Sequence, residues 1–254
     1  RVSLQSVYRT RDRVLITTLD NVRGKLAALA PGPEAWTRED VALPGLGAVS
    51  ITSTDSWQGS YFYTYTDFLN PSSLYWIEGG GSEPAEKVKN APQFFSTEGM
   101  KVEQSEASSK DGTRIPYFLV TPKGFRADGG TPTLLTGYGG FEIPEVPQYS
   151  GVSGASWLER GGAYVLANIR GGGEFGPAWH EAAQKENHHR NFEDFIAVAE
   201  DLVARKITSP KRLGIVGGSQ GGLLVSGSMV LRPDLFGAVV AAIPLTDMRR
   251  YNKL

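Results

Sequence analysis

The sequence has 254 residues, enough for two modest domains, and its 40% hydrophobic and 21% charged residues are typical of a globular protein. A net charge of −1, with no apolar run near the roughly 18 residues that span a bilayer, argues against nucleic-acid and membrane partners. Cysteine is absent, which excludes disulfides, thiolate metal sites and a cysteine nucleophile.

Up to about residue 90 the sequence predicts short antiparallel strands separated by turns. The predicted strands are 13–19, 24–29, 48–54, 60–68 and 73–78. In YFYTYT (61–66) bulky side chains alternate toward both faces, which is typical of a stacked propeller blade, with the edge of a β-sandwich as the alternative. The polar, aperiodic segment 81–93 is predicted to separate a domain over 1–90 from a domain over 91–254.

After this boundary the sequence predicts an α/β domain with a mostly parallel sheet. Residues 101–109 and 114–120 are expected to form a hairpin, because Asp111-Gly112 suits its turn. Apolar runs predict buried strands at 132–138, 163–169, 212–217 and 237–243, and helical spacing predicts helices at 191–206 and 221–231. Asn191 is expected to cap the first of these helices. Strands that alternate with helices in this way form parallel α/β sheets.

The pentapeptide GGSQG (217–221) fits the pattern G-x-S-x-G between a predicted strand and a predicted helix. The chain must turn sharply to lift the Ser219 hydroxyl above the sheet, and this turn leaves no room for Cβ atoms two residues to either side. The dipole of the following helix and the backbone N–H of Gln220 favour negative charge on a substrate oxygen. Taken alone, the pentapeptide also fits a tight turn with an inert serine.

Four blocks in chain order carry a more specific signal, and together they resemble the prolyl oligopeptidase family of serine peptidases. The blocks are LLTGYGGF (134–141), ANIRGGGEFGPAWH (167–180), TSPKRLGIVGGSQGGLL (208–224) and RPDLFGAVVA (232–241). The resemblance implies an α/β-hydrolase domain preceded by the last blades of a β-propeller. It also implies hydrolysis of short peptides through an acyl-enzyme.

The resemblance assigns a role to each of five residues. Ser219 matches the nucleophile, and the backbone N–H of Gln220 and the hydroxyl of Tyr138 match the two oxyanion donors. Phe141 and Leu245 match residues that line the pocket for the residue before the cleaved bond. Prolyl-specific members usually carry Asn where this chain has Gln220, so the preference for proline stays open. An esterase or acyl-peptide hydrolase on the same fold is the alternative, and a non-catalytic scaffold protein is a second.

The loop after the predicted strand 163–169 offers a competing interpretation. Gly171–Gly176 fits the G-x-G-x-x-G pattern of dinucleotide-binding turns. The peptidase resemblance accounts for the same stretch, so no nucleotide cofactor is predicted. Arg170 is expected to join an ion-pair or hydrogen-bond cluster beside it.

The three histidines, His180, His188 and His189, all precede Ser219, whereas this fold places its acid and histidine after the nucleophile. The pair 188–189 is expected in a solvated loop, and no metal site is predicted. We therefore expect the acid and the histidine to follow Leu254 in a longer parent protein, and this chain alone to be nearly inactive. The N-terminus shows no signal-peptide pattern, and a cytoplasmic, periplasmic or secreted parent stays open.

Overall fold

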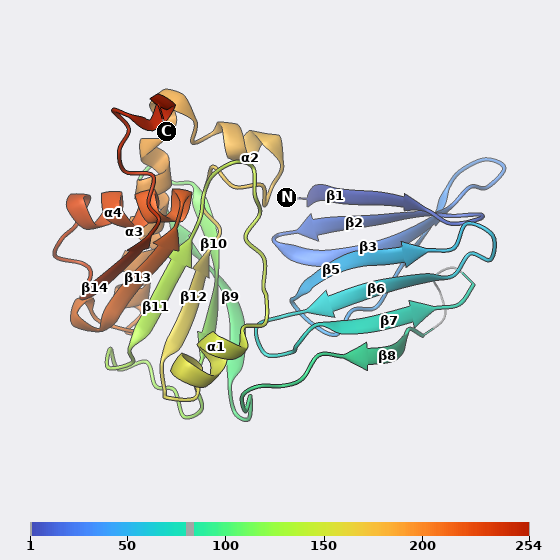
Figure 1. The fold of residues 1–254 in the computed structure, drawn as a ribbon, viewed down its shortest axis with the longest axis horizontal. Helices are drawn as coiled ribbons and strands as arrows, with labels where there is room; N and C mark the ends of the chain where they lie inside the picture. Colours follow the sequence, from blue (N-terminus) through green and yellow to red (C-terminus); the bar gives the residue numbers. More distant parts are fainter. Residues whose placement is uncertain (1, 80–83, 254) are drawn as a thin grey trace. The chain divides into compact units, whose positions relative to one another are not determined.

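A computed structural model describes residues 2–79 and 84–253 of the chain (Figure 1). The chain divides into two compact units, Arg1–Phe94 with Val146–Gly151 and Phe95–Glu145 with Val152–Leu254. The predicted linker 81–93 contains a strand, β8 (Glu86–Asn90), whose five residues are all exposed. A strand exposed along both faces shows no alternation of apolar and polar residues, which is why its sequence did not predict it.

The first unit contains two four-stranded antiparallel sheets, ordered β1-β2-β3-β4 and β5-β6-β7-β8. The remaining strands are β1 (Val2–Arg9), β2 (Val14–Asp20), β3 (Arg23–Ala30), β4 (Thr37–Asp40), β5 (Ala48–Thr54), β6 (Tyr61–Thr66) and β7 (Ser73–Ile77). The three tyrosines of β6 are fully buried, in one hydrophobic cluster with Leu15, Leu26 and Ile51. The intervening residues of β6 are half-buried, so both faces of this strand are covered as the alternation predicted.

The second unit is built on a six-stranded sheet ordered β14-β13-β11-β12-β10-β9. Its strands are β9 (Lys101–Ser108), β10 (Arg114–Thr121), β11 (Thr133–Gly137), β12 (Ala163–Ala167), β13 (Leu213–Gly218) and β14 (Ala238–Ala242). The four strands from β14 to β12 run parallel, and β10 and β9 continue the sheet antiparallel. The predicted hairpin is confirmed, and Gly112 takes the positive φ of 83° in its turn.

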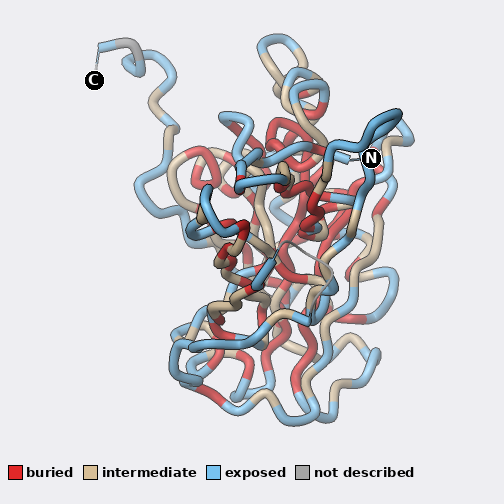
Figure 2. The backbone as a smooth tube through the Cα atoms, turned by 90° about the vertical axis from the view of Figure 1, so that its right-hand side faces the viewer, coloured by how far each residue is buried: buried red, intermediate tan, exposed pale blue. Residues whose placement is uncertain are grey.

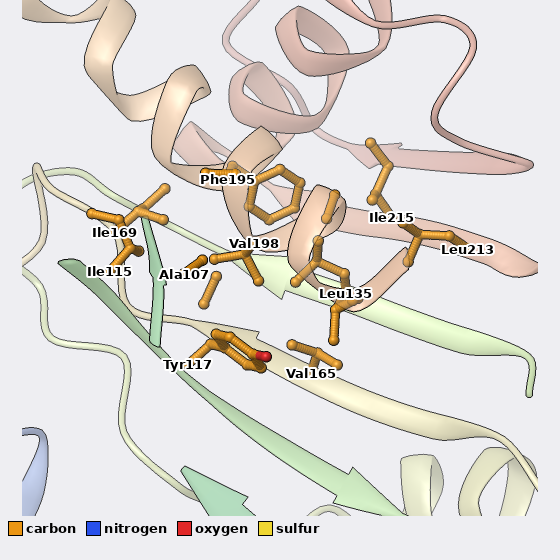
Figure 3. Packing of buried hydrophobic residues seen from close by; sticks show 14 of the residues in the cluster. Ala107, Ile115, Tyr117, Leu135, Val165, Ile169, Phe195, Val198, Leu213 and Ile215 are labelled. Carbon is orange, nitrogen blue, oxygen red and sulfur yellow. The ribbon is translucent and has the colours of Figure 1, made fainter. Parts of the chain in front are cut away.

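Helices cover this sheet and complete the core of the second unit. They are α1 (Gly151–Ser153), which continues as a π-helical turn, α2 (Pro177–Glu181), α3 (His189–Ala204) and α4 (Gln220–Leu231). Phe195 and Val198 of α3 lie over Leu135 and Val165 of the sheet, all fully buried (Figure 3). Buried stretches of the chain lie in the interior, and exposed stretches lie mainly at the outer loops (Figure 2). None of the described helices is long and apolar enough to cross a membrane.

The helix α3 begins earlier than its sequence predicted. Its first residue is His189, and His188 takes the N-cap position. Asn191 is therefore not the cap. It lies inside the first turn, where its side-chain amide donates to the carbonyl oxygens of Gly139 and Arg170 instead of to its own helix. Acceptors that are distant in the sequence outcompete a local cap, and a local pattern cannot reveal them.

Candidate active site

Ser219 links strand β13 to helix α4 through a strained backbone. Its φ of 56° and ψ of −116° lie where residues with a Cβ are rarely found. Three backbone hydrogen bonds fix this conformation: Ser219 N donates to Ala242 O at 3.0 Å, and Ser219 O accepts from Leu223 N at 3.1 Å and from Leu245 N at 3.3 Å. The residue is only half-buried, so the turn presents it at the rim of the sheet.

The flanking glycines are required by close approach of the backbone. A Cβ on Gly217 would lie 2.1 Å from Gly221 O, and a Cβ on Gly221 would lie 2.8 Å from Gly137 O. Both distances are far below van der Waals contact. The prediction that the turn has no room for side chains two residues to either side of Ser219 is confirmed.

Tyr138 reaches the same edge of the sheet from a neighbouring strand. Strands β11 and β13 are paired in parallel, and Tyr138 and Ser219 are the residues that directly follow them. The Tyr138 ring lies beside the turn, with its Cδ2 at 3.6 Å from a Cβ placed on Gly221. The helix α4 begins at Gln220, so its N–H is one of the first free amides of that helix. The predicted nucleophile and both predicted oxyanion donors therefore gather at one edge.

The two predicted pocket residues also lie around this edge. Phe141 is exposed, and its ring centroid lies 6.4 Å from that of Tyr138. Leu245 follows β14 and is tied to Ser219 by its backbone N–H.

A hollow of about 260 Å³ lies beside Phe141 and the side chain of Gln220. His180 and His188 also line it. The prediction that His188 and His189 occupy a solvated loop is wrong, since His189 opens α3 and His188 is half-buried. The ring of His188 packs edge-on against the ring of Phe192, with 5.5 Å between the two centroids. His188 is therefore packed against α3 and does not extend into solvent.

Arg170 is the centre of a buried ion-pair cluster, as predicted. Its Nε donates to Asp194 Oδ2 at 2.9 Å and its Nη2 to Asp194 Oδ1 at 2.6 Å. Its Nη1 donates to Asp111 at 2.5 Å, and this hydrogen bond holds the pKa of Asp111 well below its usual range. The cluster joins the turn of the β9–β10 hairpin, the loop after β12 and the helix α3. The glycine-rich segment 171–176, which follows Arg170, leads into α2, a helix of only five residues. It therefore does not open the long helix that follows a dinucleotide-binding turn.

Glu174, in the same loop, is a buried carboxyl group that the sequence did not single out. Its Oε1 accepts from Glu145 N at 3.1 Å, and its Oε2 is buried without a hydrogen-bond partner. Burial raises the pKa of Glu174 to about 8. The group is therefore protonated in the folded protein over a range of pH in which it is ionised in the unfolded chain.

We expect Glu174→Gln to remove a pH dependence of stability between about pH 5 and 8. The folded state keeps a proton that the unfolded state has lost above the ordinary pKa of 4.5. Stability from this group is thus fully present below that value and is lost as the pH rises toward 8. In denaturant unfolding of the full-length protein, we expect the free energy of unfolding of Glu174→Gln to rise relative to that of the natural protein. This difference should grow by a few kcal/mol across the range. The exposed Glu181→Gln is the matched control, and equal pH profiles of Glu174→Gln and the natural protein would contradict the prediction.

The fold and the strained serine together define the class of protein. A mostly parallel α/β sheet that presents a serine on a sharp strand-to-helix turn, between glycines, is the arrangement of an α/β-hydrolase. Residues 147–254 match the family model described as Prolyl oligopeptidase family. The chain belongs to the prolyl oligopeptidase family.

Individual relatives support this assignment over the whole chain. An uncharacterized peptidase of Sinorhizobium fredii is 45% identical over 252 residues, which are 99% of this chain and 35% of that protein. The solved post-proline cleaving enzyme of Rickettsia typhi is 40% identical with a TM-score of 0.90, covering 100% of this chain and 36% of the other. Prolyl oligopeptidase B of Galerina marginata, solved with a bound 25-mer substrate, is 28% identical with a TM-score of 0.90, covering 100% and 35%. The chain thus spans about a third of the length of these relatives. Their architecture identifies the two antiparallel sheets as propeller blades ahead of the α/β-hydrolase unit.

Proposed function

We propose that the full-length protein is a serine peptidase that cleaves oligopeptides through an acyl-enzyme, with Ser219 as the nucleophile. The single observation that carries this proposal is the strained Ser219 at the rim of the sheet, next to Tyr138 and the N-terminus of α4. A strained residue persists only where the surrounding structure fixes it, and such residues cluster at active sites. Family membership supports the same assignment.

In the proposed reaction the Ser219 hydroxyl attacks the scissile carbonyl and its proton passes to a histidine. The tetrahedral oxyanion accepts hydrogen bonds from the Gln220 N–H and the Tyr138 hydroxyl. A neutral phenol suits this task because it donates without a change of charge. Collapse expels the amine, which takes the proton from the histidine, and water then releases the acyl group by the same steps in reverse.

The general base is proposed to come from a part of the full-length protein outside this chain. Within residues 2–79 and 84–253, no histidine lies within hydrogen-bond reach of the Ser219 hydroxyl. The Nε2 atom of His188 instead lies 3.5 Å from Nε2 of the Gln220 side chain. A serine without a base is a weak nucleophile, so this chain alone is proposed to be nearly inactive.

Proline is proposed as the residue before the cleaved bond. The solved relative from Rickettsia typhi is a post-proline cleaving enzyme, and the exposed ring of Phe141 offers an apolar surface for a proline ring. The test measures kcat/KM of the full-length protein on two blocked peptides that differ only in carrying proline or alanine before a chromogenic leaving group. We expect the proline peptide to be cleaved with the higher kcat/KM. A ratio of kcat/KM near one would remove the proline preference and leave the peptidase assignment standing.

A fluorophosphonate probe tests the nucleophile directly in the full-length protein. The probe phosphonylates an activated serine, so we expect one labelled site, on the peptide that contains Ser219. Ser219→Ala should abolish labelling. Ser228→Ala, which removes another hydroxyl on α4, is the control and should label like the natural protein. Labelling that survives Ser219→Ala, or no labelling at all, would refute the assignment.

A further inference from the structure

The segment that carries Tyr138 is held in an unusual conformation. In this oxyanion loop, Tyr138–Glu142, positive φ angles occur at Gly139 (63°), Phe141 (55°) and Glu142 (55°). Two of these are not glycine, so the conformation is strained and must be fixed by its surroundings. Any loosening would move Tyr138, whose carbonyl group is bonded to Gly139.

Asn191 provides the buried contact that fixes the loop. Its Nδ2 donates to Gly139 O at 2.8 Å and to Arg170 O at 2.9 Å, and the side chain is fully buried. Because both partners are carbonyl oxygens, the amide must present its NH₂ group, and both of its protons are engaged. One side chain thus ties the loop after β11 to the loop after β12.

The backbone of both loops packs tightly around this amide. A Cβ on Gly139 would lie 2.0 Å from Asn191 Nδ2, and a Cβ on Gly171 would lie 2.2 Å from Gly139 O. The backbones of the two loops can approach the amide only because both positions are glycine. The contact is therefore specific to this arrangement of the oxyanion loop.

Asn191 is itself held by a rigid element. It lies in the first turn of the 16-residue α3, four residues before Phe195, which packs fully buried in the core. Asp194, three residues further along the same helix, accepts hydrogen bonds from Arg170. The helix thus serves as a fixed reference from which the amide positions the loop.

We infer that Asn191 is a positioning residue of the oxyanion hole, acting through Gly139 on the Tyr138 hydroxyl; this inference rests on the proposed peptidase function. An oxyanion donor stabilises the transition state only when it stands about 2.7–3.1 Å from the developing charge. Asn191 touches neither the reacting atoms nor the substrate. Its loss should therefore weaken stabilisation of the transition state and leave binding of the substrate in the ground state intact.

A double-mutant cycle in the full-length protein tests the inference. Asn191→Leu, which keeps the branched shape and removes both donors, should lower kcat by about ten- to a hundredfold with KM changed less than about twofold. Tyr138→Phe alone should lower kcat by about 10²- to 10³-fold. In the Tyr138→Phe background, Asn191→Leu should cost less than about twofold, because the hydroxyl that it positions is already gone.

A merely structural role predicts a different result. Losses in kcat that multiply in the double variant, or a rise in KM with kcat unchanged, would overturn the inference. Thr208→Val is the control: it removes a hydrogen bond that another buried side chain donates to a carbonyl oxygen, Thr131 O at 2.8 Å, near the opposite end of β11. It should lower stability and leave kcat unchanged.

A second variant covers the case in which Asn191→Leu does not fold. Asn191→Ser leaves space for water at the two carbonyl oxygens and should still lower kcat, and a natural kcat in a folded Asn191→Ser variant would overturn the inference. Failure of the inference and failure of the proposed function give different results. A wild-type protein that hydrolyses no peptide would refute the proposed function and the inference with it, whereas additive losses in an active enzyme would refute the inference alone.

Discussion

Ser219→Ala and Ser219→Gly should both lower kcat for peptide hydrolysis by about 10⁴- to 10⁶-fold, and only the glycine variant should gain stability. Both substitutions remove the hydroxyl on which the proposed acyl-enzyme depends. What remains is the small acceleration that binding and oxyanion stabilisation give without a nucleophile. The two variants should therefore be equally inactive.

Their stabilities should differ because Ala keeps the Cβ and Gly does not. At φ 56° and ψ −116° the Cβ of residue 219 is in a region that glycine enters freely. Relief of such strain is worth about 1–3 kcal/mol, reduced by the greater freedom of glycine in the unfolded chain. We expect Ser219→Gly to exceed Ser219→Ala by about 1 kcal/mol in denaturant unfolding of the full-length protein.

Two results would contradict this pair of expectations separately. Hydrolysis near the natural rate in either variant would remove Ser219 from the chemistry. Equal stabilities would mean that the turn is not strained. The comparison thus tests whether the protein maintains an unfavourable backbone at the position where the reaction takes place.

The turn around Ser219 could be predicted from sequence because the spacing of its glycines is a local pattern. Gly217 must lack a Cβ because of the backbone of Gly221, four residues further on, whereas Gly221 must lack one because of Gly137 O on a neighbouring strand, a long-range contact that the same pattern does not reveal. The strands β11 and β13 were likewise predictable, since strands buried on both faces read as continuous apolar runs. Tyr138 was found by resemblance, because nothing local in GYGGF indicates that its strand pairs with β13.

Features that depend on contacts across the fold could not be predicted. Asn191 looked like a helix cap because Asn is a common cap, yet its partners lie 52 and 21 residues away in the sequence. Glu174 looked like a loop residue, and only the packed structure shows that its carboxyl group is buried with one oxygen unpaired. Arg170 was expected in a cluster, but nothing in the sequence identified Asp194, 24 residues away, as its buried partner. In each case the environment of the side chain is set by residues distant in the sequence, and periodicity carries no information about such residues.

Arg170→Met should destabilise the protein by about 3–5 kcal/mol, the cost of breaking a buried ion pair on one side. Asp194 has no exposure, and its carboxylate accepts from Arg170 Nε, Arg170 Nη2, Arg170 N and Ser109 Oγ. Without the guanidinium, a charged carboxylate would remain in the core with too few donors. Asp111, the other carboxylate of the cluster, is partly exposed and can turn to water, so the penalty arises at Asp194.

A paired substitution separates this cost from a simple loss of packing. Arg170→Met with Asp194→Leu removes both charges and should be more stable than Arg170→Met alone, because replacing a whole buried pair by apolar groups is often neutral. The destabilisation of Arg170→Met should also shrink at acid pH, where Asp194 can take up a proton and become neutral. Denaturant unfolding of the full-length variants at pH 5 and pH 8 measures both effects. If the double variant is the least stable of the three, the cluster stabilises the fold through its charges, and the desolvation argument is wrong.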